Sequence, residues 1–482
     1  MTPRLSLCVA VVAFALAPTV VRAQSYPPIP VPTPVPQAQP SLSPLPYPAY
    51  GTPAPDIELL VPHPGIPTKV TVSQAIDIAV AISPTFASER AVYNELRARY
   101  TAEQQALFPA ISADGTWQKS YGGFSSGALG FSRRILTTES AGYTVSQLIF
   151  DGGRVIAAIK AAKESTLSGR GTLLRQLDTL GYDVAQGYYV VLEDQALVNA
   201  DAQLVREFTT AEDSVRAQIR NGVAARSNLA QAEYQTAKAR GTLITAQGAL
   251  ISAQSAFATL MGLDPDTKIV PKALGPDTYT QTPTYAKSLA QALLMRPDYL
   301  AAQYTVDADR SNLRYAELAR VPTVNAQWSQ GDQRQFPAIP PPGGTNGQWV
   351  QSRTLGATIT IPIYDQGITW YNVEVARYTL DQANAALSQL HLTVESDVRS
   401  ALAQLISARA VFVQAKSELS SAEVSMQAAQ ASYRVGVNTI LDLVTAEANL
   451  ATAQSDYIAA LYGVRLAEQT YLYATGLSDL HL

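Results

Sequence analysis

From about residue 70 onward, the hydrophobic positions recur with one of two periods. The last long stretch carries a large side chain every seven residues, at Leu443, Leu450, Tyr457, Val464 and Tyr471. An earlier stretch has the same ladder, at Leu229, Thr236, Leu243, Leu250 and Phe257. A sustained seven-residue period is typical of α-helices that wind around a partner in a left-handed supercoil. Both stretches are therefore predicted to be helices that pair along their length.

Four other runs alternate between apolar and polar residues, which predicts β-strands with one apolar face. Their apolar positions are Ile111, Ala113, Trp117 and Tyr121; Tyr143, Val145 and Ile149; Val324, Ala326 and Trp328; and Leu355, Ala357, Ile359 and Ile361. Two-faced strands of about ten residues with aromatic side chains are typical of transmembrane barrels, while an exposed sheet on a periplasmic domain is the alternative. Four strands cannot close a barrel and lipid does not tolerate open sheet edges, so a membrane barrel would need several chains.

The chain also repeats itself once. Pro84 and Pro297 are 213 residues apart, and Gly153 and Gly367 are 214 apart. The dipeptide Ala-Glu at residues 232–233 recurs at residues 446–447, again with an offset of 214. A constant offset through many such residues indicates one long unit copied twice rather than a short-period solenoid.

Each copy predicts the same order of elements. A first helix, at about residues 72–107 or 284–320, is expected to end before a proline, and two strands follow it. A very long helix then leads to a glycine-containing turn, and a second helix returns from that turn. The stretch from Gly153 to Arg220 has 68 residues, so a continuous helix would be about 100 Å long. Such a helix cannot be buried in a compact domain.

The N-terminus has the pattern of an export signal. Arg4 supplies the positive charge, the segment 5–17 is apolar, and small residues precede a cleavage site after Ala23. The alternative, an uncleaved anchor, needs about 20 apolar residues, and Pro18 breaks this shorter stretch. Prolines then crowd residues 27–67, which predicts an extended segment that is either a spacer along the surface or a disordered leader.

These patterns divide the chain into four parts. We expect a signal peptide at residues 1–23 and a Pro-rich extended segment at 24–69. A first repeat follows at 70–276, and a second repeat with a short C-terminal tail occupies 277–482. The uncharged stretch 242–263 is considered as a membrane helix, but its seven-residue seam favours a coiled coil.

Composition excludes several classes of function. Hydrophobic residues make up 47% of the chain and charged residues only 15%, against about 25% in an ordinary soluble domain. The net charge of −4 without a basic block argues against a nucleic-acid binder. The single cysteine and three histidines offer no metal-ligand spacing. We therefore expect neither an enzyme nor a cofactor-dependent protein.

Two pairs of motifs are specific. One is Ser146-Gln-Leu-Ile-Phe-Asp-Gly-Gly153 with its echo at residues 361–367; the other is Tyr433-Arg-Val-Gly-Val-Asn-Thr-Ile-Leu-Asp-Leu443 with its echo at residues 219–229. With the signal peptide and the repeat, they make the chain resemble the TolC-like outer-membrane efflux proteins from about Val70 to Leu477. The expected fold is mainly α with a β-barrel part: a long coiled-coil periplasmic tunnel joined to a transmembrane barrel.

The resemblance implies a homotrimer in the outer membrane of a Gram-negative bacterium, with four strands per protomer in a twelve-stranded barrel. The chain would be a passive exit duct for tripartite efflux or type I secretion. Its partners would be a periplasmic adaptor protein and an inner-membrane transporter. The alternative is a soluble periplasmic coiled-coil protein that spaces or tethers other components.

The resemblance also assigns residues to roles. Asp442 and Thr445 fall on the family's entrance constriction, where Thr445 replaces an acidic residue. Tyr433, Asn228 and Asn438 fall on the tip latch, where a hydrogen bond between Tyr433 and Asn228 is possible and would be neutral, hence weaker than a charge-assisted one. The adaptor-docking tips are placed at Arg220, Gly222, Arg434 and Gly436, and the strand-to-helix corners at Asp151, Gly153, Asp365 and Gly367. The alternative role for Asp442 is a solvated carboxylate at a helix N-terminus.

Overall fold

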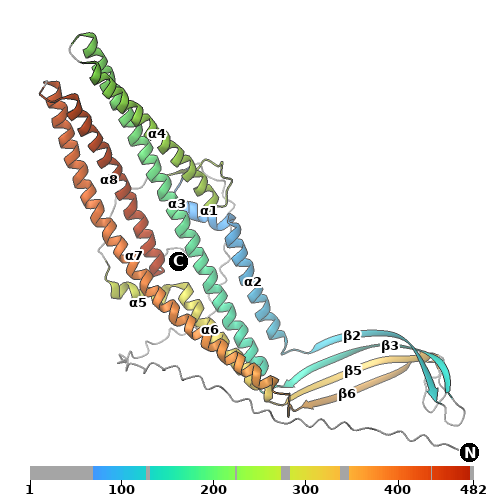
Figure 1. The fold of residues 1–482 in the computed structure, drawn as a ribbon. Coiled ribbons are helices and arrows are strands. Elements are labelled where there is room, and N and C mark those ends of the chain that lie inside the picture. Colours follow the sequence, from blue (N-terminus) through green and yellow to red (C-terminus); the bar gives the residue numbers. More distant parts are fainter. Residues whose placement is uncertain are drawn as a thin grey trace, which may run out of the picture. The chain divides into compact units, whose positions relative to one another are not determined.

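The computed structural model describes residues 69–125, 131–222, 225–272, 283–336, 347–435 and 437–477. The predicted signal peptide, nearly all of the Pro-rich segment, Gly436 and the last five residues lie outside this described part. Helices dominate, and a four-stranded sheet extends from one end of the long helices (Figure 1). The predicted class, mainly α with a β part, is confirmed.

Two very long helices form the axis of the structure. Helix α3 spans Arg154–Arg220 and helix α7 spans Ile368–Arg434, with 67 residues each. Helix α4, Arg226–Leu260, returns along α3, and helix α8, Ile440–Thr475, returns along α7 (Figure 1). Corresponding helices begin 214 residues apart, which confirms the predicted twofold repeat. At 1.5 Å per residue, each long helix separates its two ends by about 100 Å.

The seven-residue ladders lie at the helix–helix contacts. Thr236 and Phe257 are buried on α4, and Leu443, Val464 and Tyr471 are buried on α8. Helix α4 is also the one described helix that is long and apolar enough to cross a bilayer by length and composition. Its pairing with α3 through the predicted ladder agrees with a coiled coil.

The first helix of each copy is broken, contrary to the expectation of one continuous helix. The first copy has α1, Val72–Ile82, and α2, Pro84–Gln105. The second has α5, Tyr285–Met295, and α6, Pro297–Glu317, followed by a short 3₁₀ turn, Leu318–Arg320. Ser83 and Arg296 precede the prolines and have extended ψ values of 121° and 118°. A proline ring clashes with a helical residue before it, so each helix stops there and a new one begins.

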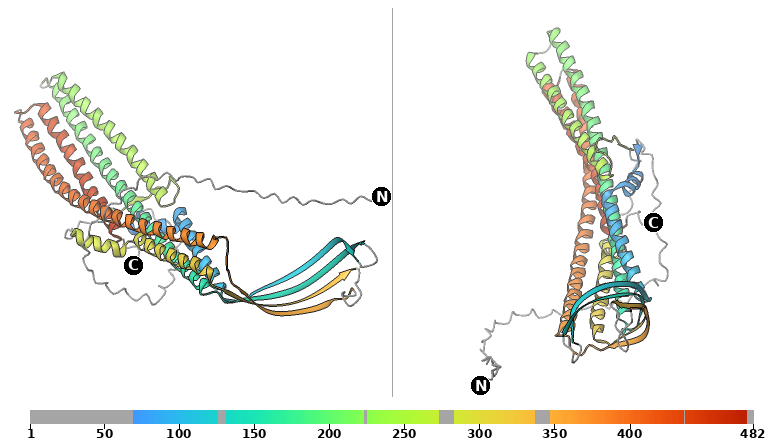
Figure 2. Two further views of the ribbon diagram at one scale, coloured as in Figure 1. Left: turned by 60° about the horizontal axis from the view of Figure 1, so that its bottom comes forward. Right: turned by 90° about the vertical axis from the view of Figure 1, so that its right-hand side faces the viewer.

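The sheet is antiparallel throughout, in the order β2-β3-β5-β6. Its strands are Ala110–Ser125, Phe131–Phe150, Thr323–Phe336 and Val350–Thr360, most of them longer than the ten residues expected. A separate pair of two-residue strands, β1 (Lys69–Val70) and β4 (Val270–Pro271), is parallel. The large sheet is curved in both views of Figure 2.

Register places apolar and polar residues on opposite faces of this sheet. One row runs across all four strands through Ile111, Val145, Trp328 and Leu355. The next row, one residue along, contains only hydroxyl side chains: Ser112, Thr144, Ser329 and Thr354. The apolar row is open to the surroundings, and Leu355 is 80% exposed. The predicted alternation is thus confirmed near the helices, whereas Ile149 falls at a bulge between Leu148 and Phe150.

Two glycines face each other where β3 pairs with β5. A Cβ on Gly142 would lie 2.9 Å from the carbonyl oxygen of Gln330, and one on Gly331 would lie 3.1 Å from that of Ala141. No side chain fits between the strands at this pair without moving the backbone. Such glycines let a sheet bend tightly, as closure into a barrel requires.

Substitution Gly142→Ala should therefore destabilise the sheet by about 1–3 kcal/mol through overpacking. The matched control is Gly356→Ala on the same face, where an added Cβ meets nothing within 4 Å. Thermal unfolding of the detergent-purified protein measures both, and equal midpoints for the two variants would contradict this account of the glycine pair.

Candidate functional site

The strand-to-helix corners have the same construction in both copies. Asp151 accepts hydrogen bonds from the N–H groups of Gly153, at 2.9 Å, and Val155, at 2.5 Å. Asp365 likewise accepts from Gly367, at 3.2 Å, and from the N–H of Thr369, at 2.7 Å. These bonds satisfy N–H groups that the first turn of a helix leaves without a partner.

Glycine is favoured at these corners because the backbone turns through the left-handed region, which Gln366 of the second copy also adopts with φ 59°. Gly153 has φ 90° and Gly367 has φ 84°. Gly152 has φ 71°, and a Cβ there would lie 2.4 Å from the side chain of Val321. The carboxylate and the glycines together redirect the chain from the sheet into a 67-residue helix.

The opposite ends of the long helices form two exposed turns. Helix α3 ends at Arg220 and the chain turns at Gly222, which has φ 74°. Helix α7 ends at Arg434, and the N–H of Val437 closes the turn on the carbonyl of Ser432 at 2.9 Å. Both arginines are exposed in the last helical turn, where the helix dipole favours a positive charge. Gly436 lies outside the described residues.

An apolar cluster joins the two hairpins just before these turns. Its buried members are Val215 from α3, Ala429 from α7, and Ile440, Leu443, Val444 and Ala446 from α8. Leu229 of α4 and Met426 of α7 pack against it. Any separation of the hairpins at this end has to expose this apolar surface to water, which holds the ends together.

Tyr433 packs against the same cluster, and its hydroxyl donates to Oε1 of Gln218 at 3.3 Å. The expected hydrogen bond to Asn228 is therefore not the one formed, because the side chain reaches α3 rather than α4. Asn438 uses its backbone N–H on the carbonyl of Ser432, at 3.4 Å. The contact between the hairpins at this level is uncharged.

Asp442 lies in the first turn of α8 and forms a capping box with Thr439. Its carboxylate accepts from the N–H of Thr439, at 2.9 Å, and from its hydroxyl, at 2.8 Å. The N–H of Asp442 in turn donates to that hydroxyl at 3.3 Å. These hydrogen bonds, first the hydroxyl and then the N–H, lower the pKa of Asp442 and keep it ionised. Thr445 is exposed one turn further along.

A polar groove of about 940 Å³ opens beside this cluster, between α3, α7 and α8. Its lining includes Gln218 and Tyr433 and also a buried carboxyl group, Glu447. Sequence reasoning noted Glu447 only as a repeated residue. A signal was present: Arg216, which pairs with the corresponding Glu233, is replaced by Gln430 in the second copy.

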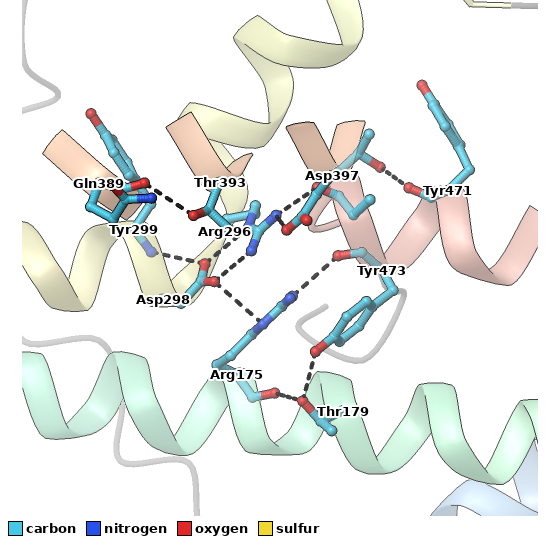
Figure 3. Close-up of polar contacts among 12 residues, drawn as sticks. Arg175, Thr179, Arg296, Asp298, Tyr299, Gln389, Thr393, Asp397, Tyr471 and Tyr473 are labelled. Carbon is cyan, nitrogen blue, oxygen red and sulfur yellow. Dashed lines mark hydrogen bonds and ion pairs between the residues drawn. The ribbon is translucent and has the colours of Figure 1, made fainter. Parts of the chain in front are cut away.

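Midway along the helices, a buried ionic network that sequence reasoning missed connects the two copies (Figure 3). Arg296, whose side chain is 3% exposed, donates to both carboxylate oxygens of Asp298, at 3.1 and 2.7 Å. It also donates to Asp397 of α7, at 2.9 Å, and to the carbonyl of Ala474 in α8, at 3.4 Å. The arginine thus holds α6, α7 and α8 together.

Arg175 extends this network to α3. Its Nε lies 3.5 Å from Asp298, its Nη1 donates to the carbonyl of Tyr473 at 3.1 Å, and its guanidinium stacks over the Tyr473 ring at 3.7 Å (Figure 3). Burial opposes ionisation of Asp298, but hydrogen bonds from Arg296 and the charges of Arg175 and Arg296 outweigh it and lower the pKa of Asp298. The four helices therefore meet at one network of ion pairs and hydrogen bonds.

The described residues contain no group of three or more metal-ligating side chains. The protein combines long helical hairpins with a four-stranded sheet that has one apolar row, one polar row and two open edges. This combination defines the class of channel-tunnel proteins. The chain belongs to the outer membrane efflux protein family, whose model matches residues 75–263 and 288–476. It is an outer-membrane protein with its helices in the periplasm, as its TolC-like features predict.

Individual relatives agree with this assignment. The outer membrane efflux protein BepC of Brucella suis is 26% identical over 340 residues, covering 70% of this chain and 72% of BepC. The probable efflux pump outer membrane protein TtgC of Pseudomonas putida is 25% identical over 380 residues, covering 78% and 75%. The CmeC outer membrane channel of Campylobacter jejuni has the same fold, with a TM-score of 0.74, 16% identity and coverage of 84% and 85%.

Substitution Arg296→Met should destabilise the protein by about 3–5 kcal/mol, because Asp298 and Asp397 would lose their buried partner. The control is Arg377→Met, which removes an exposed pair with Glu374 at 3.0 Å and should cost about 0–1 kcal/mol. Thermal unfolding measures both.

A second measurement uses pH. Because the pKa of Asp298 is lowered, its stabilising effect is complete above the unfolded pKa of 3.8 and is lost as pH falls through the folded value. The wild type should therefore lose more stability in acid than Arg296→Met. Parallel acid profiles would contradict this role for the network.

Proposed function

We propose that the chain is the passive outer-membrane exit duct of a tripartite efflux or type I secretion system, and that it works as a homotrimer. The observation that carries this proposal is the open sheet. Strands β2 and β6 are its two edges, and on one of its faces the row of residues near the helices is apolar and exposed. Unpaired backbone groups cannot lie in lipid, so edge strands in an outer-membrane protein must pair with other copies of the chain.

Three copies would close a twelve-stranded barrel, in which the apolar row meets lipid and the hydroxyl row lines water. Each protomer would contribute its two hairpins to a periplasmic tunnel. We divide the chain as the sequence suggests, into residues 1–23, 24–69, 70–276 and 277–482. Family membership favours this duct over a soluble periplasmic spacer.

The turns at the ends of the hairpins would be where a periplasmic adaptor docks and an inner-membrane transporter delivers its cargo. Arg220, Gly222 and Arg434 are exposed there and present backbone and positive charge to a partner. Tyr433 and Gln218 would form the latch between the hairpins, with Asn228 and Asn438 beside it. The relatives named as efflux pump components support such partners.

Two measurements test the proposal directly. The detergent-purified protein should have the mass of three copies, and it should conduct ions when inserted into a planar bilayer. Recovery from the soluble periplasmic fraction as a monomer without conductance would instead support the spacer.

Asp442 offers a sharper test of the entrance. Three ionised Asp442 side chains around one passage should favour cations, so Asp442→Asn should lower the cation-to-anion permeability ratio in the bilayer. The control Thr439→Ala removes the hydroxyl that caps α8, at a cost of about 1 kcal/mol, but retains the charge. It should therefore keep the wild-type ratio.

The two roles of Asp442 predict different results. A wild-type ratio in Asp442→Asn would leave the carboxylate as a helix cap only and would remove it from the constriction. Loss of selectivity in both variants would mean that the capping box, rather than the charge, determines the entrance.

A further inference from the structure

Glu447 is an unusual residue for its position. Its side chain lies on α8 next to the apolar cluster and is 6% exposed. Its Oε2 is buried and has no hydrogen-bond partner among the described residues. Burying a charged carboxylate without a hydrogen-bond partner costs folding free energy. A glutamate in this position therefore needs an explanation, such as a bound ligand that removes its charge or its unpaired state.

Among the described residues, no group that faces Glu447 donates a hydrogen bond to its buried Oε2. The groove that contains it presents Arg206 and Glu207 from α3, and Tyr433 and Arg434 from α7. Of these, Glu207 is the charge that acts on Glu447, and it is also acidic. The carboxylate of Glu207 accepts a hydrogen bond, at 2.9 Å, from the side chain of Gln203 one turn earlier on α3.

In the first copy, the glutamate at the position that corresponds to Glu447 is exposed and paired with a cation. Glu233 is half exposed and lies 3.4 Å from Arg216. The residue at the Arg216 position in the second copy is Gln430, and at the Glu207 position it is Ser421. The second copy has therefore lost the cation, while its glutamate has become buried opposite a second carboxyl group.

A proton is the ligand that fits this site. Burial, and after it the charge of Glu207, raises the pKa of Glu447 to about 7. When protonated, Glu447 is neutral and able to donate to a carboxylate, which removes the cost of burying a charge. Within the part of the chain that the structure describes, no group of three or more metal-ligating side chains is present, so the site would offer a metal ion only two carboxylates.

We propose that Glu447 is a proton-binding site that couples the contact between α8 and α3 to the surrounding pH, so that proton release favours separation of the two hairpins. The inference rests on the proposed duct, because it requires a passage that this separation widens. The packed arrangement binds the proton more tightly than a solvated carboxyl group does. Its stability is therefore greatest below pH 4.5 and falls as pH rises toward about 7.

Conductance of the full chain in a planar bilayer tests the proposal between about pH 5 and about pH 9. The wild type should conduct more as pH rises, with a midpoint near the pKa of about 7. Glu447→Gln should lose this transition and remain at the low-pH conductance at every pH. Glu207→Gln should keep the transition and shift its midpoint to lower pH, because one of the two causes of the raised pKa is removed.

The matched control is Glu233→Gln, which changes the same position of the first copy and should keep the wild-type midpoint. A transition that survives in Glu447→Gln would overturn the inference while leaving the duct intact. Absence of conductance in the wild type at every pH would instead count against the duct itself.

Infrared difference spectroscopy gives a readout that does not depend on gating. A protonated carboxyl band in the wild type should disappear as pH rises through about 7 and should be missing in Glu447→Gln. The same band in both proteins would also overturn the assignment.

Discussion

An open sheet edge in lipid is the constraint on which this structure depends. The sheet has four strands, with β2 and β6 at its edges and, near the helices, an exposed row of apolar residues on one face. Water cannot satisfy backbone groups inside a bilayer, so the edges have to be paired between chains. In the proposed trimer, pairing of these edges would close a barrel and would bring the attached helices together at the same time. The corners built on Asp151 and Asp365 join the sheet to the long helices, and they would carry this assembly from one to the other.

The helical part solves a different problem, which is how very long helices stay ordered without a compact core. Helices α3 and α7 pack along α4 and α8 through a thin seam of residues seven positions apart, and small residues cover much of the rest. Each seam buries little surface per turn, so stability has to come from length and from a few strong contacts. The network around Arg296 is one of these, and the apolar cluster near the turns is another. The low charge of the chain agrees with the proposed trimer, in which much of the surface would face another helix, lipid or the interior of a tube.

Features with a regular period, and turns marked by proline or glycine, could be predicted from the sequence, while contacts between distant residues could not. The ladders, the repeat and the corners are local patterns with a direct physical cause, and the long helices followed from them. The sequence shows Pro84 and Pro297, but the prediction of one continuous helix through each of them is wrong. Each proline is the first residue of a new helix, because its ring disfavours a helical conformation of the residue before it. The choice of Gln218 rather than Asn228 by Tyr433, and the burial of Glu447, depend on how α3 meets α7 and α8. No period in a single sequence encodes that contact.

The network around Arg296 also determines how the molecule can deform. It ties α3, α6, α7 and α8 at one level, and Asp397 lies 37 residues before the end of α7 at Arg434. At 1.5 Å per residue, the part of α7 beyond the network is about 55 Å long, and it would move together with α8, along which it packs. A rotation of about five degrees around the network would move the turn by about 5 Å, while the residues at the pivot would hardly shift. A small rotation that the side chains at the middle of α7 can accommodate would thus become a displacement of about 5 Å at its end. The sheet at the opposite end would stay in place.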